Sequence, residues 1–252
     1  MITVISYCRH PMPQSVQEKN VAKTAGAEID YRMIDGSGGP LQCAAAYNWA
    51  LGQAAGDCIV FLADDCYFMS MNWAQALEAK FVGDPTLGII GLAGTQYLFR
   101  DKYSWTAAGR PFVKGRIVYH LQNNDFFAVA FSTEKGDVDV VACDGCMLAV
   151  RADVARQVLF DDAMFTGEHF WDLDFCLRCR AFARAIVTSD ITVKRREQPA
   201  YGKEWHEDGQ RFLYKHASVL PAWCAEYADT PLPGPAAQIV NLQGKYSAET
   251  IC

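Results

Sequence analysis

Two adjacent carboxylates end an apolar run in the stretch IVFLADDCYFM, residues 59–69. Asp64 and Asp65 follow residues whose apolar character predicts a buried strand. A divalent ion such as Mg²⁺ or Mn²⁺ would bind both carboxylates and take diphosphate oxygens at its other positions. An ordinary loop, in which one aspartate caps the following helix, would use the same residues. The pair alone therefore leaves metal binding and helix capping open.

A second group of carboxylates lies further along the chain. Asp144 precedes Gly145 before an apolar run, where it either forms a turn or accepts hydrogen bonds from a polar substrate such as a sugar. In GEHFWDLDFCLRCR, Asp172 and Asp174 are two residues apart, so a helix turns them to nearly opposite sides. If Asp172 faces a pocket, it can act as a general base, and Asp174 is left to stabilise the helix start or pair with Arg178. Two helix-capping acids are the alternative.

The stretch VKRREQ brings together three cations, Lys194, Arg195 and Arg196. A short basic run in a loop is commonly a solvated face. Here it could instead supply positive charge to a diphosphate. Both interpretations stay open on local grounds.

Four of the ten cysteines form two CxxC pairs, CDGC and CLRC. Structural zinc sites use such pairs. However, 29 residues separate Cys146 from Cys176, which is longer than the usual spacing of a zinc knuckle. Both pairs also lie in apolar stretches, where cysteine behaves as a small buried hydrophobe. We therefore favour buried thiols over a zinc site.

The first hundred residues alternate the patterns of strands and helices that would position these side chains. This order predicts an α/β fold with a parallel sheet and helices on both faces. Ligands of such sheets bind beyond the carboxyl ends of the strands. Asp64 and Asp65 lie at one such end, beside Tyr7 and Asp35 at the ends of two other strands. The strand patterns cover residues 2–7, 28–35, 58–63 and 87–94, and the helical patterns cover residues 13–26, 41–55 and 72–82.

The second half of the chain is less regular. Residues 95–142 are rich in Gly and aromatic residues, with alternating runs such as RIVYHLQ and FFAVAFS, and predict loops and antiparallel strands around a substrate pocket. From Leu220 the chain carries four prolines, which predict a tail that is extended over the surface or disordered. Helices are expected at 151–160, 169–183 and 203–217, and a strand at 185–190.

The composition limits the possible partners. With 252 residues, 51% of them hydrophobic, the chain can bury a substantial core. Its formal net charge of −6 argues against nucleic acid as a partner. No apolar stretch approaches the roughly 20 residues that span a bilayer, and the N-terminus begins directly with a strand pattern. We expect a cytoplasmic protein without a transmembrane segment, with peripheral docking to the inner face of a membrane left open.

Together, these stretches resemble the GT-A glycosyltransferases of family 2, and among them the glycosyltransferase-like branch. The resemblance covers about residues 2–217. It is carried by GPLQCAAAYNWALGQAAGDCIVFLADDC, by PTLGIIGLAGT, and by DGCMLAVRADV followed by FDDAMFTGEHFWDLDFCLRCR. The most specific part is the segment DLDFCLR, and the order and spacing of the blocks agree as well.

The resemblance implies a Rossmann-like, mostly parallel central sheet with helices on both faces and a smaller antiparallel acceptor-side portion. It implies one catalytic domain over residues 1–218. Residues 1–94 would form its nucleotide-binding half and residues 95–218 its acceptor-side half. Residues 219–252 would be a Pro-rich C-terminal tail.

The resemblance also assigns roles around a nucleotide-sugar donor. Asp65 matches the metal-binding acid, with Asp64 beside it in contact with the metal shell or the ribose, and the metal would be Mn²⁺ or Mg²⁺. Tyr7 and Asp35 match strand-end positions that hold the nucleobase and ribose. Asp144 matches a contact to a sugar.

Asp172 matches the catalytic base of an inverting transferase, which implies transfer of a hexosyl-type group to a hydroxyl of a saccharide or other acceptor.

The sequence departs from the family pattern at two positions. The first position of the fuller acidic motif is Ala63, and a histidine that relatives carry after the DITV strand is replaced by VKRREQ. Lys194, Arg195 or Arg196 then neutralises the diphosphate directly, or the site is weakened.

Two other classes stay open. One is a catalytically weakened GT-A protein that binds nucleotides or serves as a scaffold, which the two departures motivate. The other is a nucleotidyltransferase, which would share the strand-end metal site. YCRHPMPQ, after the first strand, lacks the Gly-rich, lysine-containing phosphate loop of that class, so we rank it low.

Overall fold

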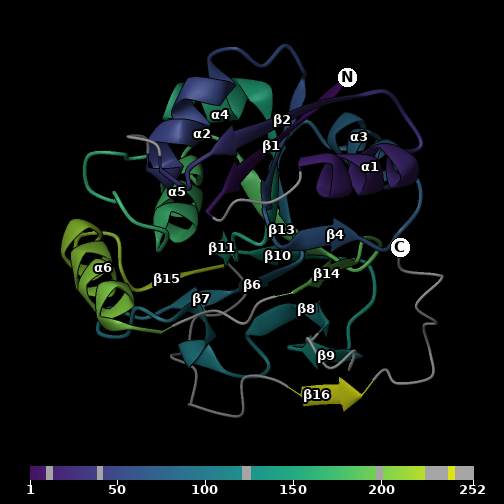
Figure 1. The fold of residues 1–252 in the computed structure, drawn as a ribbon. Helices are drawn as coiled ribbons and strands as arrows, with labels where there is room; N and C mark the ends of the chain where they lie inside the picture. The colour runs from purple at the N-terminus through teal and green to yellow at the C-terminus, as the bar shows by residue number, and fades with distance from the viewer. Residues whose placement is uncertain (10–13, 39–41, 121–125, 197–200, 225–237, 242–252) are drawn as a thin grey trace.

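The computed structural model describes residues 1–9, 14–38, 42–120, 126–196, 201–224 and 238–241. Seven strands form a central sheet in the order β10-β13-β5-β12-β3-β1-β2, with helices on both faces (Figure 1). The predicted strands of the first half are confirmed. The strands are β1 Ile2–Cys8, β2 Ile29–Asp35, β3 Cys58–Ala63, β5 Leu87–Gly91, β10 Asp137–Val140, β12 Met147–Arg151 and β13 Arg184–Thr188.

The sheet is mixed, so the expectation of a mostly parallel sheet is wrong. β2, β1 and β3 are parallel neighbours as expected, and β5 pairs in parallel with β13. β12, however, lies antiparallel between β3 and β5, and β10 is antiparallel to β13. The chain turns at residues 144–146 and enters β12 at the end of the sheet where β3 finishes. A parallel strand would need a crossover of a dozen or more residues, and the turn has no room for one.

The alternation of side chains along the strands divides the core into two clusters. Ile5 and Phe61 pack in the cluster that includes α2, α4 and α5, whereas Val4 and Val60 pack in the cluster that includes α1 and α3. Successive side chains of a strand point to opposite faces, so each face is covered by its own helices (Figure 1). The helices are α1 Gln14–Ala25, α2 Cys43–Leu51, α3 Trp73–Gly83, α4 Ala152–Val158 and α5 Trp171–Cys179.

A second sheet with strand order β11-β6-β8-β14-β4 lies beyond the central one. The antiparallel strands predicted in the region of RIVYHLQ and FFAVAFS are confirmed, and the structure pairs them with each other as β8 and β9. Part of the C-terminal segment is extended, because β16 pairs with β9 and β15 pairs with β7. The prolines at 231, 233 and 235 lie outside the described residues. The elements are β4 Cys66–Phe68, β6 Ala93–Thr95, β7 Tyr97–Leu98, β8 Val113–His120, β9 Phe126–Ala130, β11 Ala142–Cys143, β14 Val193–Arg195, α6 Lys203–Lys215, β15 Ala222–Trp223 and β16 Gln238–Asn241.

Both acidic turns lie at the passage from one sheet to the other. Asp64 and Asp65 join β3 of the central sheet to β4 of the second sheet. Asp144 and Gly145 join β11 of the second sheet to β12 of the central one. The register of the two sheets therefore brings the two predicted groups of carboxylates to the same end of the molecule.

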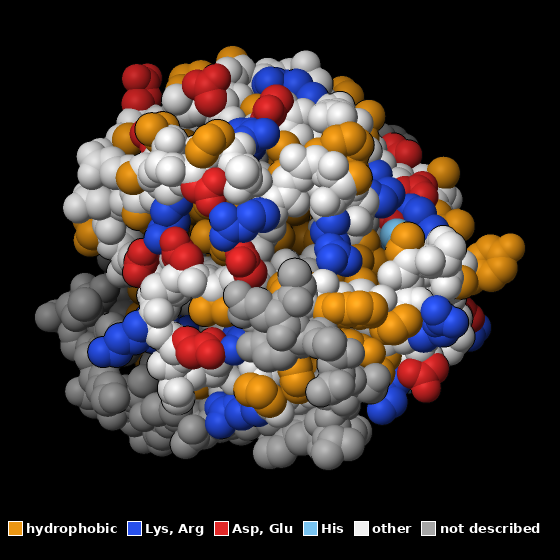
Figure 2. All heavy atoms as spheres, turned by 180° about the vertical axis from the view of Figure 1, so that it is seen from behind, with side chains coloured by type: hydrophobic (Ala, Val, Ile, Leu, Met, Phe, Trp, Pro, Cys, Tyr) orange, Lys and Arg blue, Asp and Glu red, His pale blue; other side chains and the backbone are white. Residues whose placement is uncertain are grey.

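The surface carries both signs of charge. On the described part of the face in Figure 2, Lys and Arg side chains alternate with Asp and Glu side chains, so positive charge is not gathered there. Within the described residues, no helix combines the length and the apolar character needed to cross a membrane.

Asp174 is a buried ionic link between α5 and α6. Its Oδ2 accepts a hydrogen bond of 2.8 Å from Nε of Arg178, which confirms the predicted pairing. Its Oδ1 lies 2.8 Å from Nε2 of His216 and 2.5 Å from Nζ of Lys215. Burial alone would raise the pKa of Asp174, but His216, Arg178 and Lys215 outweigh it and lower the pKa. The carboxylate therefore stays charged and ties the two helices together.

Replacing Asp174 by Asn should lower the free energy of unfolding at pH 7 by about 3 kcal/mol, because partners of a buried charge lose their counter-ion. The folded-state pKa of Asp174 is below its ordinary value, so its contribution is present above that value and is lost as the pH falls. The difference from wild type should shrink below about pH 4. Urea unfolding across pH measures both effects. Asp139→Asn, at a half-exposed ion pair with Arg184, should cost less than about 1 kcal/mol, and equal costs for the two variants would contradict the role of Asp174.

Candidate functional site

A cavity of about 700 Å³ opens between the two sheets and α6. Five of the residues predicted from the sequence line it together: Tyr7, Asp64, Asp144, Asp172 and Arg195. They come from segments that are far apart in the chain, at the ends of β1, β3 and β11, at the start of α5 and at the end of β14. The structure thus gathers most of the predicted site around one space.

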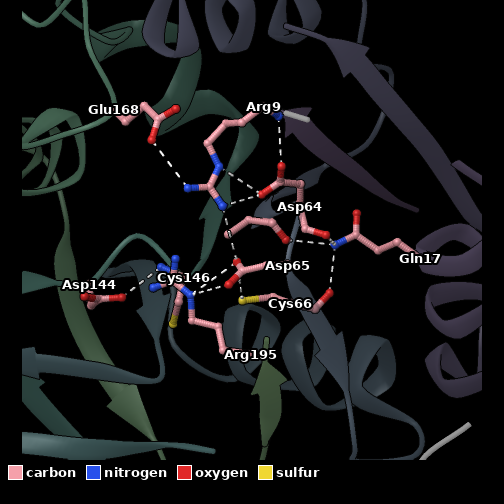
Figure 3. Close-up of polar contacts among 10 residues, drawn as sticks. Arg9, Gln17, Asp64, Asp65, Cys66, Asp144, Cys146, Glu168 and Arg195 are labelled. Atoms are coloured by element: carbon pink, nitrogen blue, oxygen red, sulfur yellow. Dashed lines mark hydrogen bonds and ion pairs between the residues drawn. The ribbon is translucent and has the colours of Figure 1, made fainter. Parts of the chain in front are cut away.

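Asp64 is held by Arg9, which follows β1 (Figure 3). Oδ1 of Asp64 accepts hydrogen bonds from Nε and Nη2 of Arg9 at 3.1 and 2.8 Å, and Oδ2 accepts the Arg9 backbone N–H at 2.8 Å. Nη1 of Arg9 also lies 3.4 Å from Glu168. Burial would lower the pKa of Arg9, but the carboxylates of Asp64 and Glu168 outweigh it and raise the pKa. Arg9 is therefore a permanent cation at the cavity wall.

Asp65 is paired with Arg195 in the same way. β14 runs antiparallel to β4 with Arg195 opposite Cys66, so its side chain reaches the carboxylate of Asp65 from the second sheet (Figure 3). Nε of Arg195 donates to Oδ2 and Oδ1 of Asp65 at 3.0 and 3.2 Å. Asp65 is 4% exposed and does not line the cavity, whereas Arg195 does. The guanidinium group of Arg195 therefore faces the cavity in place of the Asp65 carboxylate.

Gln17 of α1 supports the backbone of this acidic turn. Its buried Nε2 donates to the carbonyl oxygens of Ala63 and Cys66 at 2.8 and 2.7 Å and lies 3.3 Å from that of Asp64 (Figure 3). Its Oε1 accepts a hydrogen bond of 2.7 Å from the hydroxyl of Tyr31. One side chain thus bonds to backbone carbonyls on both sides of the point where the chain passes from one sheet to the other.

Asp172 and Asp144 are joined through Gly145. Oδ2 of Asp172 accepts the Gly145 backbone N–H at 2.7 Å, and its Oδ1 accepts the N–H of Leu173 at 2.8 Å. Oδ1 of Asp144 accepts the Cys146 N–H at 2.9 Å, which closes the turn. A Cβ on Gly145 would lie 2.9 Å from Oδ2 of Asp172 and 2.8 Å from the ring of Trp171, so only glycine fits here.

The environment of Asp172 suits a base that works near neutral pH. Burial, and then the negative charge of Asp144, raise the pKa of Asp172 to about 7. The N–H groups of Leu173 and Gly145 oppose this shift without cancelling it. A carboxylate with such a pKa can take a proton at pH 7 and give it up again.

Some predicted residues lie apart from the cavity. Asp35 ends β2 but does not line the cavity, and its carboxylate accepts hydrogen bonds from the backbone and hydroxyl of Ser37 at 2.9 and 2.6 Å. Those hydrogen bonds lower the pKa of Asp35. Of the cationic run, Lys194 and Arg196 lie over the ring of Tyr67, and neither lines the cavity.

Sequence reasoning missed Arg9 and Gln17. The signal for Arg9 was a cation directly after the first strand, at the sheet edge where the aspartates were already expected. Gln17 gave no such signal, because its partners are backbone carbonyls that are identified only by the fold.

The four CxxC cysteines are buried free thiols, as the sequence analysis favoured. The Cys143 N–H donates to the sulfur of Cys176 at 3.5 Å. Hydrogen bonding to Cys176 and burial raise the pKa of Cys143, and burial raises that of Cys146. Raised pKa values keep these thiols neutral, whereas zinc binds thiolates, so this environment does not favour zinc.

A divalent ion at Asp64 and Asp65 does not fit the residues as they stand. Each carboxylate is already neutralised by its own arginine, at hydrogen-bond distance. In the part of the chain that the structure describes, no group of three or more His, Cys, Asp or Glu side chains is arranged to hold a metal ion. Within the described residues, the two carboxylates expected to bind Mn²⁺ or Mg²⁺ are therefore both occupied by arginine.

Comparison with known proteins identifies the family. A family model described as "Glycosyltransferase like family" matches residues 14–218, which is most of the chain. The chain belongs to this family. No curated protein matches it.

Two solved structures are similar to the chain. A crystal structure of GalNAc-T7 with UDP, GalNAc and Mn²⁺ matches with a TM-score of 0.58 and 11% identity, over 84% of this chain and 47% of that one. The chain thus spans about half the length of GalNAc-T7. The mannosyltransferase PcManGT from Pyrobaculum calidifontis, in complex with GDP-Man and Mn²⁺, matches with a TM-score of 0.49 and 15% identity over 86% of this chain and 61% of that one. The fold is that of the GT-A glycosyltransferases, as the resemblance in sequence implied.

Replacing Gln17 by Leu should lower the free energy of unfolding by about 2 kcal/mol, because buried carbonyls lose their donor. The exchange of backbone amides in residues 63–68 should also become faster, measured by native-state hydrogen exchange. Gln75→Leu, which removes one exposed hydrogen bond to the Gly26 carbonyl, is the matched control and should change little. Unchanged exchange in Gln17→Leu would show that the turn does not depend on this side chain.

Proposed function

We propose that the protein transfers a hexosyl-type group from a nucleoside diphosphate sugar to a hydroxyl acceptor, in one displacement with inversion. The observation that carries the proposal is the arrangement of one cavity. A base candidate, Asp172, faces the same space as two arginines at the carboxyl ends of the strands. Family membership supports the reaction class, and ligands of open α/β sheets bind at this edge.

In this proposal Asp172 removes the proton of the acceptor hydroxyl. The acceptor oxygen forms a bond to the anomeric carbon while the bond from that carbon to the phosphate oxygen breaks, and the electron pair leaves with the nucleoside diphosphate. Asp172 keeps the proton until solvent removes it. The hydrogen bonds from Gly145 and Leu173 fix the carboxylate in position without protonating it.

The donor is assigned to the β1, β3 and β14 side of the cavity. Tyr7 offers its ring to the nucleobase, and Asp144 offers an oxygen to a sugar hydroxyl. Asp35 is left out because its carboxylate is exposed and bonded to Ser37. Mn²⁺ or Mg²⁺ is also left out of the reaction scheme, because arginines occupy the carboxylates that would bind it.

The acceptor is assigned to the α6 side, where aromatic rings line the cavity. The ring of Trp205 lies 4.9 Å from that of Tyr103 and 4.9 Å from that of Tyr201. Aromatic surfaces with a few placed polar groups are typical of sites for organic ligands, and sugar rings pack their C–H faces on such surfaces. A saccharide is therefore the acceptor class that we favour.

The test is a panel of UDP- and GDP-sugars offered with saccharide acceptors, followed by release of the nucleoside diphosphate. The anomeric configuration of the product, read by NMR, should be opposite to that of the donor. A product with retained configuration would rule out the single displacement.

A second candidate is a nucleotide-binding or scaffold protein without turnover. The observation that favours this candidate is the pairing of Asp64 and Asp65 with arginines, because paired carboxylates do not offer the open oxygens of a metal site. Tight nucleotide binding without transfer across the whole donor panel would support this candidate over the transferase.

Asp172→Asn should lower kcat by about 10²-fold or more, the usual contribution of a general base. Nucleotide affinity should stay within about threefold of wild type, because the donor does not contact this carboxylate in the proposal. Steady-state kinetics and calorimetric titration of UDP separate the two effects. Asp162→Asn, at an exposed carboxylate bonded to Asn48, is the control and should keep full activity. Equal loss of binding and turnover would contradict the role of Asp172 as base.

The kcat/KM profile should rise with pH through an apparent pKa of about 7 and level off above it, because the base must be ionised. Asp144 contributes to the raised pKa, so Asp144→Asn should move the rise to lower pH, whatever its effect on the plateau. The measurement is kcat/KM from pH 5 to pH 9 for both proteins. Superimposable normalised profiles would show that the titrating group is not Asp172.

A further inference from the structure

Two guanidinium groups cover the acidic turn on the side of the cavity. Asp64 and Asp65 are 3% and 4% exposed, and each is held by an arginine that lines the cavity, Arg9 and Arg195 (Figure 3). A ligand that enters this end of the cavity therefore meets two guanidinium groups, while the two carboxylates are almost inaccessible. This is the reverse of a metal site, in which the carboxylate oxygens must be open to the ion.

Arg195 has donors left for a ligand. Every hydrogen bond that its side chain makes with the described residues comes from Nε. The two terminal amino groups hold the planar fork that binds phosphate through parallel hydrogen bonds. Asp65 fixes the orientation of the fork from behind, which lowers the entropic cost of binding.

The charge of both arginines is secured by their surroundings. Burial would lower the pKa of Arg195, but neighbouring groups that include Asp65 and Asp144 outweigh it and raise the pKa. Two guanidinium ions carry the same total charge as one divalent ion. They can therefore offset the charge that develops on a departing diphosphate.

We propose that Arg9 and Arg195 bind the diphosphate of the donor directly, and that donor binding and departure of the nucleoside diphosphate require no divalent ion. This inference rests on the proposed function and concerns the same site. A metal ion at Asp65 would have to displace Arg195 from a nearly inaccessible carboxylate. The displaced guanidinium would then share the cavity with the metal, at a cost in repulsion.

Four other carboxylates that line the cavity already have hydrogen-bond or ion-pair partners. Glu168 contacts Arg9, and Glu207 lies 3.3 Å from Nζ of Lys203. Asp144 and Asp172 each accept backbone N–H groups at the turn around Gly145. The arginine pair is thus the positive centre of the donor end.

The experiment is calorimetric titration of UDP and of GDP into the full chain, in excess EDTA and in excess Mn²⁺. Wild type should bind one of the two nucleotides with dissociation constants that agree within about twofold in the two buffers. Arg195→Ala and Arg9→Ala should each weaken binding about tenfold or more in both buffers, because a charge-assisted hydrogen bond to phosphate is lost.

The variant Asp65→Asn distinguishes a site in which arginine binds the diphosphate from a site in which a metal ion does. With arginine as the binding group, this variant should still bind the nucleotide in EDTA. At a metal site it would lose binding. Arg184→Ala, which removes a surface ion pair with Asp139, is the control and should bind like wild type. Arg195→Lys, which keeps the charge, and thermal unfolding of each variant distinguish a lost contact from a failure to fold.

Binding at least about tenfold tighter in Mn²⁺ than in EDTA, together with loss of binding in Asp65→Asn, would overturn the arginine proposal and leave the transferase proposal standing. Absence of binding for both nucleotides in both buffers would overturn both proposals. Metal-independent binding that Arg195→Ala does not weaken would also overturn the role of Arg195.

Discussion

The site depends on one electrostatic constraint: two adjacent carboxylates are almost removed from water and must be neutralised where they stand. Unpaired, each would cost several kcal/mol to bury. Arg9 comes from the end of the first strand and Arg195 from β14 of the second sheet, so satisfying this constraint ties both sheets to the acidic turn. Gln17 holds the backbone of the same turn, since it donates to the carbonyl oxygens of Ala63 and Cys66, on either side of the two aspartates. This end of the cavity is thus formed by charge pairing, and the guanidinium groups of Arg9 and Arg195 line it.

The mixed direction of the central sheet is what brings Asp172 to the same cavity as these arginines. β12 enters the sheet against the direction of β3, so the turn before it lies at the carboxyl end of β3, beside the acidic turn. Gly145 in that turn has no side chain, and its N–H can bond Asp172 at the start of α5. A parallel β12 would have begun at the far end of the sheet and left Asp172 without this partner.

Local patterns in the sequence were sufficient for the elements and for much of the site. Apolar periodicity located β1, β2 and β3 and the helices between them, and helical geometry correctly separated Asp174, which pairs with Arg178, from Asp172, which lines the cavity. The direction of β12 was not predictable in this way, because it depends on where the chain re-enters the sheet. Nor was the pairing of Arg9 with Asp64, since a contact across 55 residues follows only from the register of β1 and β3. For Asp35 the predicted strand was correct, but the predicted site was not reached. The end of β2 is exposed there, and the carboxylate of Asp35 bonds to Ser37 instead of lining the cavity.

Asp172 and Asp174 show how one helix can tune two carboxylates in opposite directions. Asp174 faces Arg178, Lys215 and His216, which lower its pKa and make it a structural anion. Asp172 faces the cavity, where burial and the charge of Asp144 raise its pKa to about 7. The difference comes from which face of α5 each residue occupies, and hence from a spacing of two in the sequence. Negative charge thus has two different outcomes around one cavity: Asp64 and Asp65 are paired with arginines, whereas burial and the charge of Asp144 leave Asp172 able to accept a proton near neutral pH. A cation placed against Asp172 would lower this pKa, so the hydrogen bonds and ion pairs that hold Arg9 and Arg195 on Asp64 and Asp65 also preserve the electrostatic environment of Asp172.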